Sequence, residues 1–150
     1  MNRTIKKIAG LVMVISLLTL STGCIDGKHI KASGNYITKN IQVGNFSAIK
    51  VQGSEDVLYS QSTDGKTSVK VYASDNIIDL LNIRVEDETL VIGYKKNVSI
   101  FGLGNEDKVK VIVSNPTLNG LKIQGSGDIL LKTDVKSSKL DITVQGSGNI

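Results

Sequence analysis

The sequence predicts an all-β fold in which short strands stack in parallel as the turns of a coil. Three observations predict it. The 150 residues are 40% hydrophobic, carried mainly by Val, Ile and Leu, of which Val and Ile are enriched in strands. Several segments alternate apolar and polar residues with a period of two, and one short motif occurs three times. The length fits a single domain.

The N-terminal segment has the pattern of a secretory signal. Arg3, Lys6 and Lys7 precede an apolar run over residues 8–20, and small residues follow before Cys24. The run is shorter than the roughly 18 to 20 residues that a membrane-spanning helix needs. Leu-Ser-Thr-Gly-Cys, residues 20–24, resembles the lipobox of bacterial lipoproteins. The sequence therefore predicts a signal peptide over residues 1–23 and a lipidated Cys24 that anchors the chain to a membrane.

The net charge of +4 comes mainly from this signal. Removing its three positive charges leaves 15 Lys and Arg against 14 Asp and Glu, a net charge of +1, with Arg84 as the one remaining arginine. A nucleic-acid surface needs clustered Lys and Arg, so no nucleic-acid partner is expected. One Cys excludes an intramolecular disulfide, and one Cys with one His excludes a Cys/His zinc cluster.

Residues 25–40 are polar and rich in turn formers, which predicts a tether between Cys24 and the folded domain. His29 lies five residues beyond Cys24. It is therefore expected to be a solvated linker residue rather than a catalytic or metal-binding one.

Beyond the tether, most of the chain alternates apolar and polar residues, which predicts half-buried strands. Residues 83–92 form two such segments around the acidic tip Glu86-Asp87-Glu88, which predicts a hairpin. Residues 75–81 have helical spacing, enough for one or two turns. The apolar members of the other alternating segments are Ile49 and Val51, Val69 and Val71, Val109, Val111 and Val113, and Leu140, Ile142 and Val144.

A motif of the form apolar-Gln-Gly-Ser-x-Asp/Asn-apolar occurs at residues 51–57, 123–129 and 144–150. The last two copies begin 21 residues apart. Parallel stacking would bury the apolar residues and pair each strand with its neighbours. We expect the glycines to permit tight corners and close approach, Ser and Asp/Asn to bond local backbone, and Gln52, Gln124 and Gln145 to stack their amides. The turn residues with this structural role are Gly53, Ser54, Asp56, Gly125, Ser126, Gly127, Asp128, Gly146, Ser147, Gly148 and Asn149.

Other interpretations of these motifs lack residues that their chemistry needs. Gly125-Ser126-Gly127-Asp128 resembles the calcium-binding nonapeptide of RTX proteins, but the spacing is 21 rather than nine residues and the third copy has Asn149. Residues 64–67 contain the Gly-Lys-Thr ending of a phosphate loop without its first glycine or following helix. The acidic residues 86–88 predict an exposed turn rather than an acid/base pair. No catalytic residue, metal or cofactor is expected.

From about residue 36 to residue 150 the chain resembles the auto-transporter adhesin head domain, called the GIN domain, of Bacteroidetes envelope proteins. The matching stretches are Phe46–Gly53, the hairpin Val85–Ile92, the strand Val109–Pro116 with Leu118 behind it, and the Gly-Ser-Gly-Asp/Asn turns. The resemblance implies a right-handed parallel β-helix-like solenoid with an N-terminal β-hairpin region, and a role in adhesion. It supplies no ligand and no catalytic residues. The expected organisation is a signal peptide (1–23), a lipidated Cys and polar tether (24–40) and a GIN-type β-solenoid (41–150), incomplete at its C-terminus.

The favoured interpretation is a non-enzymatic, lipid-anchored outer-membrane lipoprotein that faces the periplasm or the cell surface. Its stacked β face would bind a glycan or a protein. The alternative is a lyase-like, polysaccharide-active enzyme on a β-helix, which would need convergent carboxylates for calcium and a positioned basic residue; Arg84, beside an acidic turn, is a poor candidate. Because the third motif copy ends at Ile150, the coil would be uncapped. We expect the natural chain to continue past Ile150 or the open solenoid end to self-associate.

Overall fold

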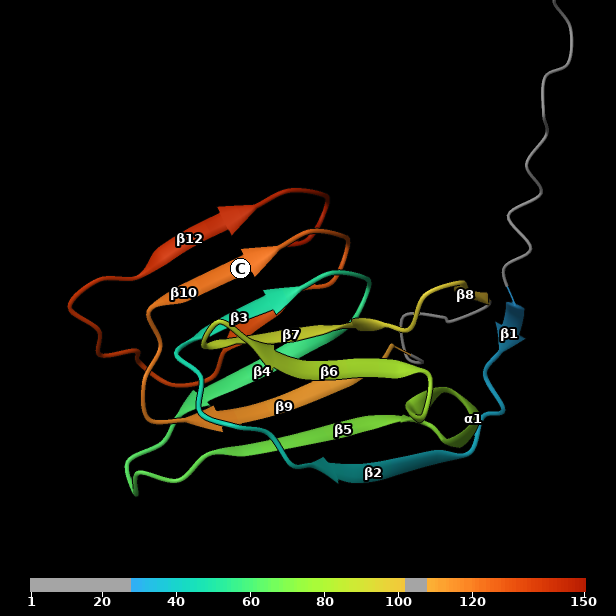
Figure 1. The fold of residues 1–150 in the computed structure, drawn as a ribbon, viewed down its shortest axis with the longest axis horizontal. Helices are drawn as coiled ribbons and strands as arrows, with labels where there is room; N and C mark the ends of the chain where they lie inside the picture. The colour runs from blue at the N-terminus through green and yellow to red at the C-terminus, as the bar shows by residue number, and fades with distance from the viewer. Residues whose placement is uncertain (1–27, 102–107) are drawn as a thin grey trace, which may run out of the picture.

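A computed structural model describes residues 28–101 and 108–150. The described chain is mostly β, with one short helix, which confirms the predicted fold class at this level (Figure 1). Two five-stranded sheets enclose the core, and a small two-stranded sheet lies near the helix. In the described part, no helix is both long and apolar enough to cross a membrane. The predicted signal and Cys24 lie outside the described residues.

The first large sheet, called the β3 sheet, has the strand order β12-β10-β3-β7-β6. Four of its strands are parallel neighbours, and β6 runs antiparallel to β7. Its strands are β3 (Ala48–Val51), β6 (Leu81–Glu86), β7 (Thr89–Tyr94), β10 (Gly120–Ile123) and β12 (Asp141–Val144).

The second large sheet, called the β4 sheet, has the order β11-β4-β9-β5-β2. Strands β11, β4 and β9 are parallel, whereas β5 and β2 are antiparallel to their neighbours. Its strands are β2 (Tyr36–Ile41), β4 (Asp56–Gln61), β5 (Ser68–Ser74), β9 (Lys110–Asn115) and β11 (Ile129–Leu131). Both sheets are thus mixed, and the fully parallel solenoid expected from the sequence is not identified in this structure.

The predicted hairpin is confirmed as β6 and β7, joined by a two-residue turn in which Asp87 and Glu88 have φ of 46° and 57°. Two positive φ values match the twist of the flanking strands. The hairpin lies in the middle of the chain, however. The described N-terminal strands pair with distant partners instead: β1 (Lys28–Lys31) with β8 (Val98–Phe101), and β2 with β5. His29 therefore lies in a strand, and the segment expected to be a polar tether contains β1 and most of β2.

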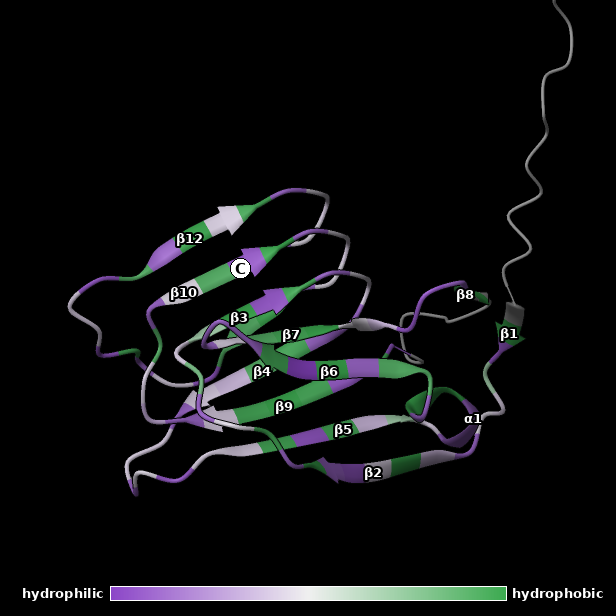
Figure 2. Cartoon of the chain, viewed as in Figure 1, coloured by the Kyte–Doolittle hydropathy of each residue, from purple (hydrophilic) through white to green (hydrophobic). Residues whose placement is uncertain are grey.

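The core lies between the two large sheets and is built by the period-two alternation. In β4, Val57 and Tyr59 are fully buried, whereas Leu58 between them is on the outer side. The buried Tyr59 hydroxyl donates a hydrogen bond to the carbonyl of Asn115 at 2.8 Å, which satisfies its polar atom. Hydrophobic stretches follow the strands, notably β9 (Figure 2). Other core residues include Ile49, Val51, Val71, Leu90, Ile92, Val111, Leu121, Ile123 and Ile129.

The predicted helical turn is α1 (Asp75–Ile78), which buries Ile77 and Ile78 against the core. The chain after β1 is fastened to this helix by polar contacts. The Ser33 amide donates to the Ser74 hydroxyl at 3.0 Å, and the Asn35 side-chain amide donates to the Asp75 carboxylate at 2.8 Å. These contacts fix the entry of the chain into the domain beside α1.

Candidate functional site

The three copies of the repeat motif form turns that stack directly on one another. We call residues 52–56, 124–128 and 145–149 the stacked turns. The amides of Ser126 and Gly127 donate to the Gly53 carbonyl at 2.9 and 3.1 Å, and those of Ser147 and Gly148 donate to the Gly125 carbonyl at 3.0 and 3.3 Å. Copies one and two lie 72 residues apart in the sequence and are nevertheless in register through β3 and β10. The side chains of Ser54, Ser126 and Ser147 are exposed.

The glycines of the stacked turns are explained by close approach of main chains. A Cβ atom on Gly125 would lie 2.2 Å from the Gly53 carbonyl oxygen, and one on Gly127 would lie 2.0 Å from the Glu55 carbonyl oxygen. A Cβ on Gly148 would likewise lie 2.0 Å from the Gly127 carbonyl oxygen. Among the five glycines of these turns, positive φ occurs at Gly146, with φ of +144°. Contact between copies therefore constrains these positions more than turn conformation does.

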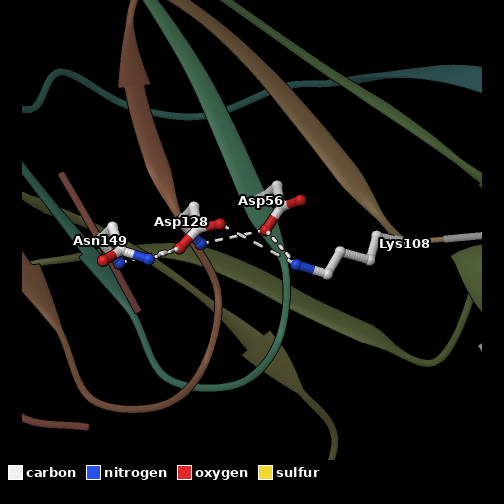
Figure 3. A network of polar contacts seen from close by, with 4 residues as sticks. All are labelled: Asp56, Lys108, Asp128 and Asn149. Atoms are coloured by element: carbon white, nitrogen blue, oxygen red, sulfur yellow. Dashed lines mark hydrogen bonds and ion pairs between the residues drawn. The ribbon is translucent and has the colours of Figure 1, made fainter. Parts of the chain in front are cut away.

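The Asp/Asn position of the motif forms a ladder across the copies (Figure 3). The Asp56 carboxylate accepts a hydrogen bond from the Asp128 amide at 3.0 Å. The Asp128 carboxylate accepts two from Asn149, from its main-chain amide at 2.8 Å and its side-chain amide at 3.0 Å. Lys108 Nζ lies 3.4 Å from Asp56 Oδ1 and 4.0 Å from Asp128 Oδ2. We call these four residues the Asx ladder.

The bonding of the Asx ladder indicates a structural use of its carboxylates. The Asn149 main-chain and side-chain amides, with a smaller contribution from Lys108, hold the pKa of Asp128 below its ordinary value. The Asp56 and Asp128 side chains each bond the following copy, and the Asn149 side chain bonds the preceding one, rather than the local backbone expected from the sequence. Within the two described ranges, no group of three or more His, Cys, Asp and Glu residues could hold a metal ion.

A second ladder comes from the glutamines that precede the glycines. Gln124 Nε2 donates to Gln145 Oε1 at 3.0 Å, as the amide stacking between copies requires. Gln52, the glutamine of the first copy, lies beside Gly93 of β7. A Cβ atom added to Gly93 would lie 3.3 Å from the Cβ of Gln52.

Glu55 is a buried carboxylate in the first of the stacked turns. Its side chain is fully buried, and neither carboxylate oxygen has a donor in hydrogen-bonding geometry. Burial raises the pKa of Glu55 from 4.5 to about 6, although the nearby main-chain amides of Glu55 and Gly53 partly oppose this. The buried Tyr94 hydroxyl also lacks a partner in hydrogen-bonding geometry, and burial followed by the charge of Glu55 raises its pKa.

The outer face of the β4 sheet carries an aligned row of side chains that alternate with the core residues. Strand register places Asn40, Lys70, Ile112, Leu58 and Leu130 side by side across five strands. Ile112 is 41% exposed and Leu130 is 51% exposed. The row therefore presents a continuous apolar stretch to solvent, with a lysine beside it. We call this surface the outer face.

An adjacent row on the outer face carries aromatic and basic groups. Tyr72 and Lys110 are register partners, and the Lys110 ammonium lies 6.0 Å from the centroid of the Tyr72 ring. Tyr36 stacks on Tyr72 with ring centroids 5.4 Å apart. A groove of about 330 Å³ lies at the far edge of this face, between the Asx ladder and the side chains of Leu58, Leu130 and Ile150. Apolar, aromatic and cationic groups are thus combined on one sheet face.

The sequence indicated the stacked turns but missed three parts of this arrangement. Alternation around Ile112 already placed it opposite Val111 and Val113, but its alignment with Leu58 and Leu130 depends on long-range register. Lys108 has no motif of its own. Glu55 did have a signal, because it occupies the position at which the other two copies have Gly127 and Gly148.

Known proteins are similar to this chain in both sequence and fold. Its residues 45–150 match the family described as "Putative auto-transporter adhesin, head GIN domain". No curated protein matches it. Among solved structures, a putative adhesin from Bacteroides fragilis is 33% identical with a TM-score of 0.72, and the match covers 79% of this chain and 53% of that one.

Two structures from Parabacteroides distasonis are similar as well. A putative adhesin is 28% identical with a TM-score of 0.62, covering 81% of this chain and 58% of that one. A protein described as a putative lipid binding protein is also 28% identical, with a TM-score of 0.65 and coverage of 78% and 49%. This chain spans about half the length of these structures. The family match extends over more than two thirds of the 150 residues, and the chain therefore belongs to the auto-transporter adhesin head GIN domain family.

Proposed function

We propose that the protein is a non-enzymatic adhesion module of the cell envelope that binds a glycan or protein surface through the outer face of the β4 sheet. One observation carries this proposal: Ile112, Leu58 and Leu130 form an aligned, solvent-facing apolar row beside Lys70 and the Tyr72–Lys110 pair. A contiguous apolar surface rimmed by polar groups is typical of an interaction site. The adhesin descriptions of the relatives support the same class of function.

A lyase-like enzyme is the less favoured alternative. Such an enzyme needs carboxylates free to bind calcium or to transfer protons. The aligned carboxylates of this chain, Asp56 and Asp128, instead accept main-chain hydrogen bonds and face Lys108. In this proposal the binding face is carried by a coiled, solenoid-like scaffold, as expected from the sequence. The parallel strand pairs within each sheet support that arrangement.

The proposal places the protein in the outer membrane, held by a lipid on Cys24 and facing the periplasm or the cell surface. Support comes from the signal-like segment and the lipobox-like residues 20–24. Labelling of cells with a radioactive fatty acid should mark the chain and not its Cys24→Ala variant. Recovery of the Cys24→Ala variant in the membrane fraction, or an unmodified N-terminal mass, would contradict the anchor. Self-association remains a prediction.

Adhesion is tested by binding of the purified protein to arrayed glycans and to immobilised extracellular-matrix proteins. The variant Ile112→Asp with Leu130→Asp places two charges in the apolar row and should abolish binding. The matched control is Ile142→Asp, which changes an exposed isoleucine on β12 of the other sheet. Equal binding by the double variant and the unsubstituted chain would rule out the outer face as the adhesive surface.

A further inference from the structure

A groove lies beside α1 and is lined by residues of β2 and β6, the edge strands of the two large sheets. Its volume is about 200 Å³. The apolar lining comes from both sheets and from the helix. Its members are Ile41, Val71, Ile78, Leu81 and Ile83. The groove is smaller than the about 300–1,000 Å³ of typical small-molecule sites, so it suits part of one hydrocarbon chain rather than a whole metabolite.

Two lysines meet at the rim of this groove. Lys39 Nζ lies 2.7 Å from the Asp79 carboxylate, and Lys95 Nζ donates to the Asp79 main-chain carbonyl at 2.6 Å. The Lys39 hydrogen bond, and to a lesser degree Lys95, lower the pKa of Asp79. Two ammonium groups against one carboxylate leave an excess positive charge at the rim. The Lys39 and Asp79 side chains are 52% and 73% exposed, so an incoming anion can reach them.

The groove lies at the end of the domain where the chain enters from its N-terminal segment. Asn76 of α1 donates to the Lys31 carbonyl at 2.8 Å, which holds the end of β1 against the helix. Lys31 at the end of β1 and Lys96 next to Lys95 are exposed and add positive charge, and Asp75 in the first turn of α1 adds a negative charge. Strand β1 begins four residues after Cys24, a span of at most about 14 Å. A lipid on Cys24, which this step takes from the proposed function, would therefore hold this end close to the membrane.

We infer that the groove between β2 and β6 binds an anionic phospholipid of that membrane, with the phosphate at Lys39 and Lys95 and one acyl chain along the partly exposed side chains of Ile41 and Ile83. An inorganic anion would use the lysines and leave the apolar lining in water. A neutral hydrocarbon would use the lining and leave the excess charge uncompensated. An anionic amphiphile satisfies both, and a negative membrane surface also attracts the neighbouring lysines.

The test uses dihexanoyl-phosphatidylglycerol, a soluble anionic lipid, below the concentration at which it forms micelles. The protein is the full chain carrying Cys24→Ala, labelled at its isoleucine methyl groups, and NMR shifts are followed during titration. We expect saturable shifts of Ile41, Ile78 and Ile83 and none of Ile112. The double variant Lys39→Gln, Lys95→Gln should bind about tenfold more weakly or worse. The matched control Lys70→Gln, Lys110→Gln removes two lysines from the outer face and should bind normally.

Each alternative occupant gives a different result, and each would overturn the inference. Equal binding of dihexanoyl-phosphatidylcholine would show that the charge is not used, and the same shifts with inorganic phosphate would show a simple anion site. Shifts of Ile112 would place the lipid on the outer face, and the absence of shifts would exclude the site. This titration requires neither the lipid on Cys24 nor adhesion. If the acylation or adhesion experiments failed, the lipid titration would still give an independent result.

Discussion

Glu55 is a single side chain whose burial couples the stability of the fold to pH. Its pKa is raised from 4.5 to about 6 by burial in the first stacked turn. The folded chain therefore binds this proton more tightly than the unfolded chain. The resulting stabilisation is fully present below pH 4.5 and is lost as pH rises through 6, and it amounts to about 2 kcal/mol.

The variant Glu55→Gln removes the titrating group and keeps the shape of the side chain. We expect the unsubstituted chain to lose about 2 kcal/mol of unfolding free energy between pH 4.5 and pH 7 relative to Glu55→Gln. Urea unfolding followed by circular dichroism at several pH values measures this difference. Glu88→Gln, which changes an exposed glutamate in the β6–β7 turn, is the control and should retain the pH dependence. Parallel pH profiles of Glu55→Gln and the unsubstituted chain would refute the assignment.

For single residues, the sequence identified the positions with a structural role more readily than the physical reason for that role. The motif singled out Gly125, Gly127 and Gly148, where the main chains of neighbouring copies approach closely, whereas the positive φ within these turns occurs at Gly146. Glu55 interrupts the motif, and its charge acts on Tyr94 at the end of β7, a neighbour that no local pattern identifies.

The turns between strands are elements that fit together through main-chain contact. A methyl group on Gly127 would lie 2.0 Å from the Glu55 carbonyl oxygen, so Gly127→Ala forces the second turn away from the first. Overpacking of this kind costs about 1–3 kcal/mol or more, and we expect a loss of about 3 kcal/mol. The control is Gly44→Ala, because a Cβ there would meet nothing within 4 Å.

Chemical unfolding of both glycine variants measures the effect on the stacked turns. The Gly44→Ala protein should unfold at nearly the same urea concentration as the unsubstituted chain. If Gly127→Ala were equally stable, the turns would not be in the direct contact that the structure describes. A crystal structure of a stable Gly127→Ala protein would then have to show the two turns moved apart.

Strands with one buried face were largely predictable, whereas the edge strand β2 was not. In β9, Val111 and Val113 are buried as their alternation predicted. In β4, burial alternates although residues 57–59 are all apolar, so the pattern alone did not identify the buried face. In β2, the four central residues are exposed, so neither face needed apolar residues and the segment resembled a linker. The antiparallel pairing of β5 with β9 and with β2 is likewise absent from the local pattern, because it depends on which distant strands β5 meets.

For the whole molecule, the candidate binding surfaces depend on long-range register. The outer face aligns Ile112, Leu58 and Leu130 from three strands, and the groove beside α1 joins β2 to β6. The sequence contains every one of these residues without indicating that they are neighbours. The repeat motif was the exception, because identical turns stack on one another and therefore identify their own neighbours.

The same arrangement implies that stability is graded across the molecule. The central strands are β3 and β7 of one sheet and β4 and β9 of the other, and their inward-facing residues form the core between the sheets. Val57, Leu90 and Val111 of these strands are fully buried. All four residues of β12 are exposed, with Ile142 at 54% and Val144 at 46%. Elements with few buried contacts open locally at a lower free energy than the global unfolding transition.

Native-state hydrogen exchange in low concentrations of urea should separate these elements. We expect the β12 amides to exchange first, through an opening that depends little on urea, and the β9 and β4 amides to exchange last, with the full urea dependence of global unfolding. Strand β2 is the informative comparison, since it is also an exposed edge but pairs with β5 along six residues. Its amides should exchange between the two groups. If the β12 and β9 amides exchanged with the same free energy of opening, the stacked copies would unfold as one cooperative unit. The hydrogen bonds of Asp128 and Gln124 to the third copy would then transmit the stability of the core to β12 at the edge of the sheet.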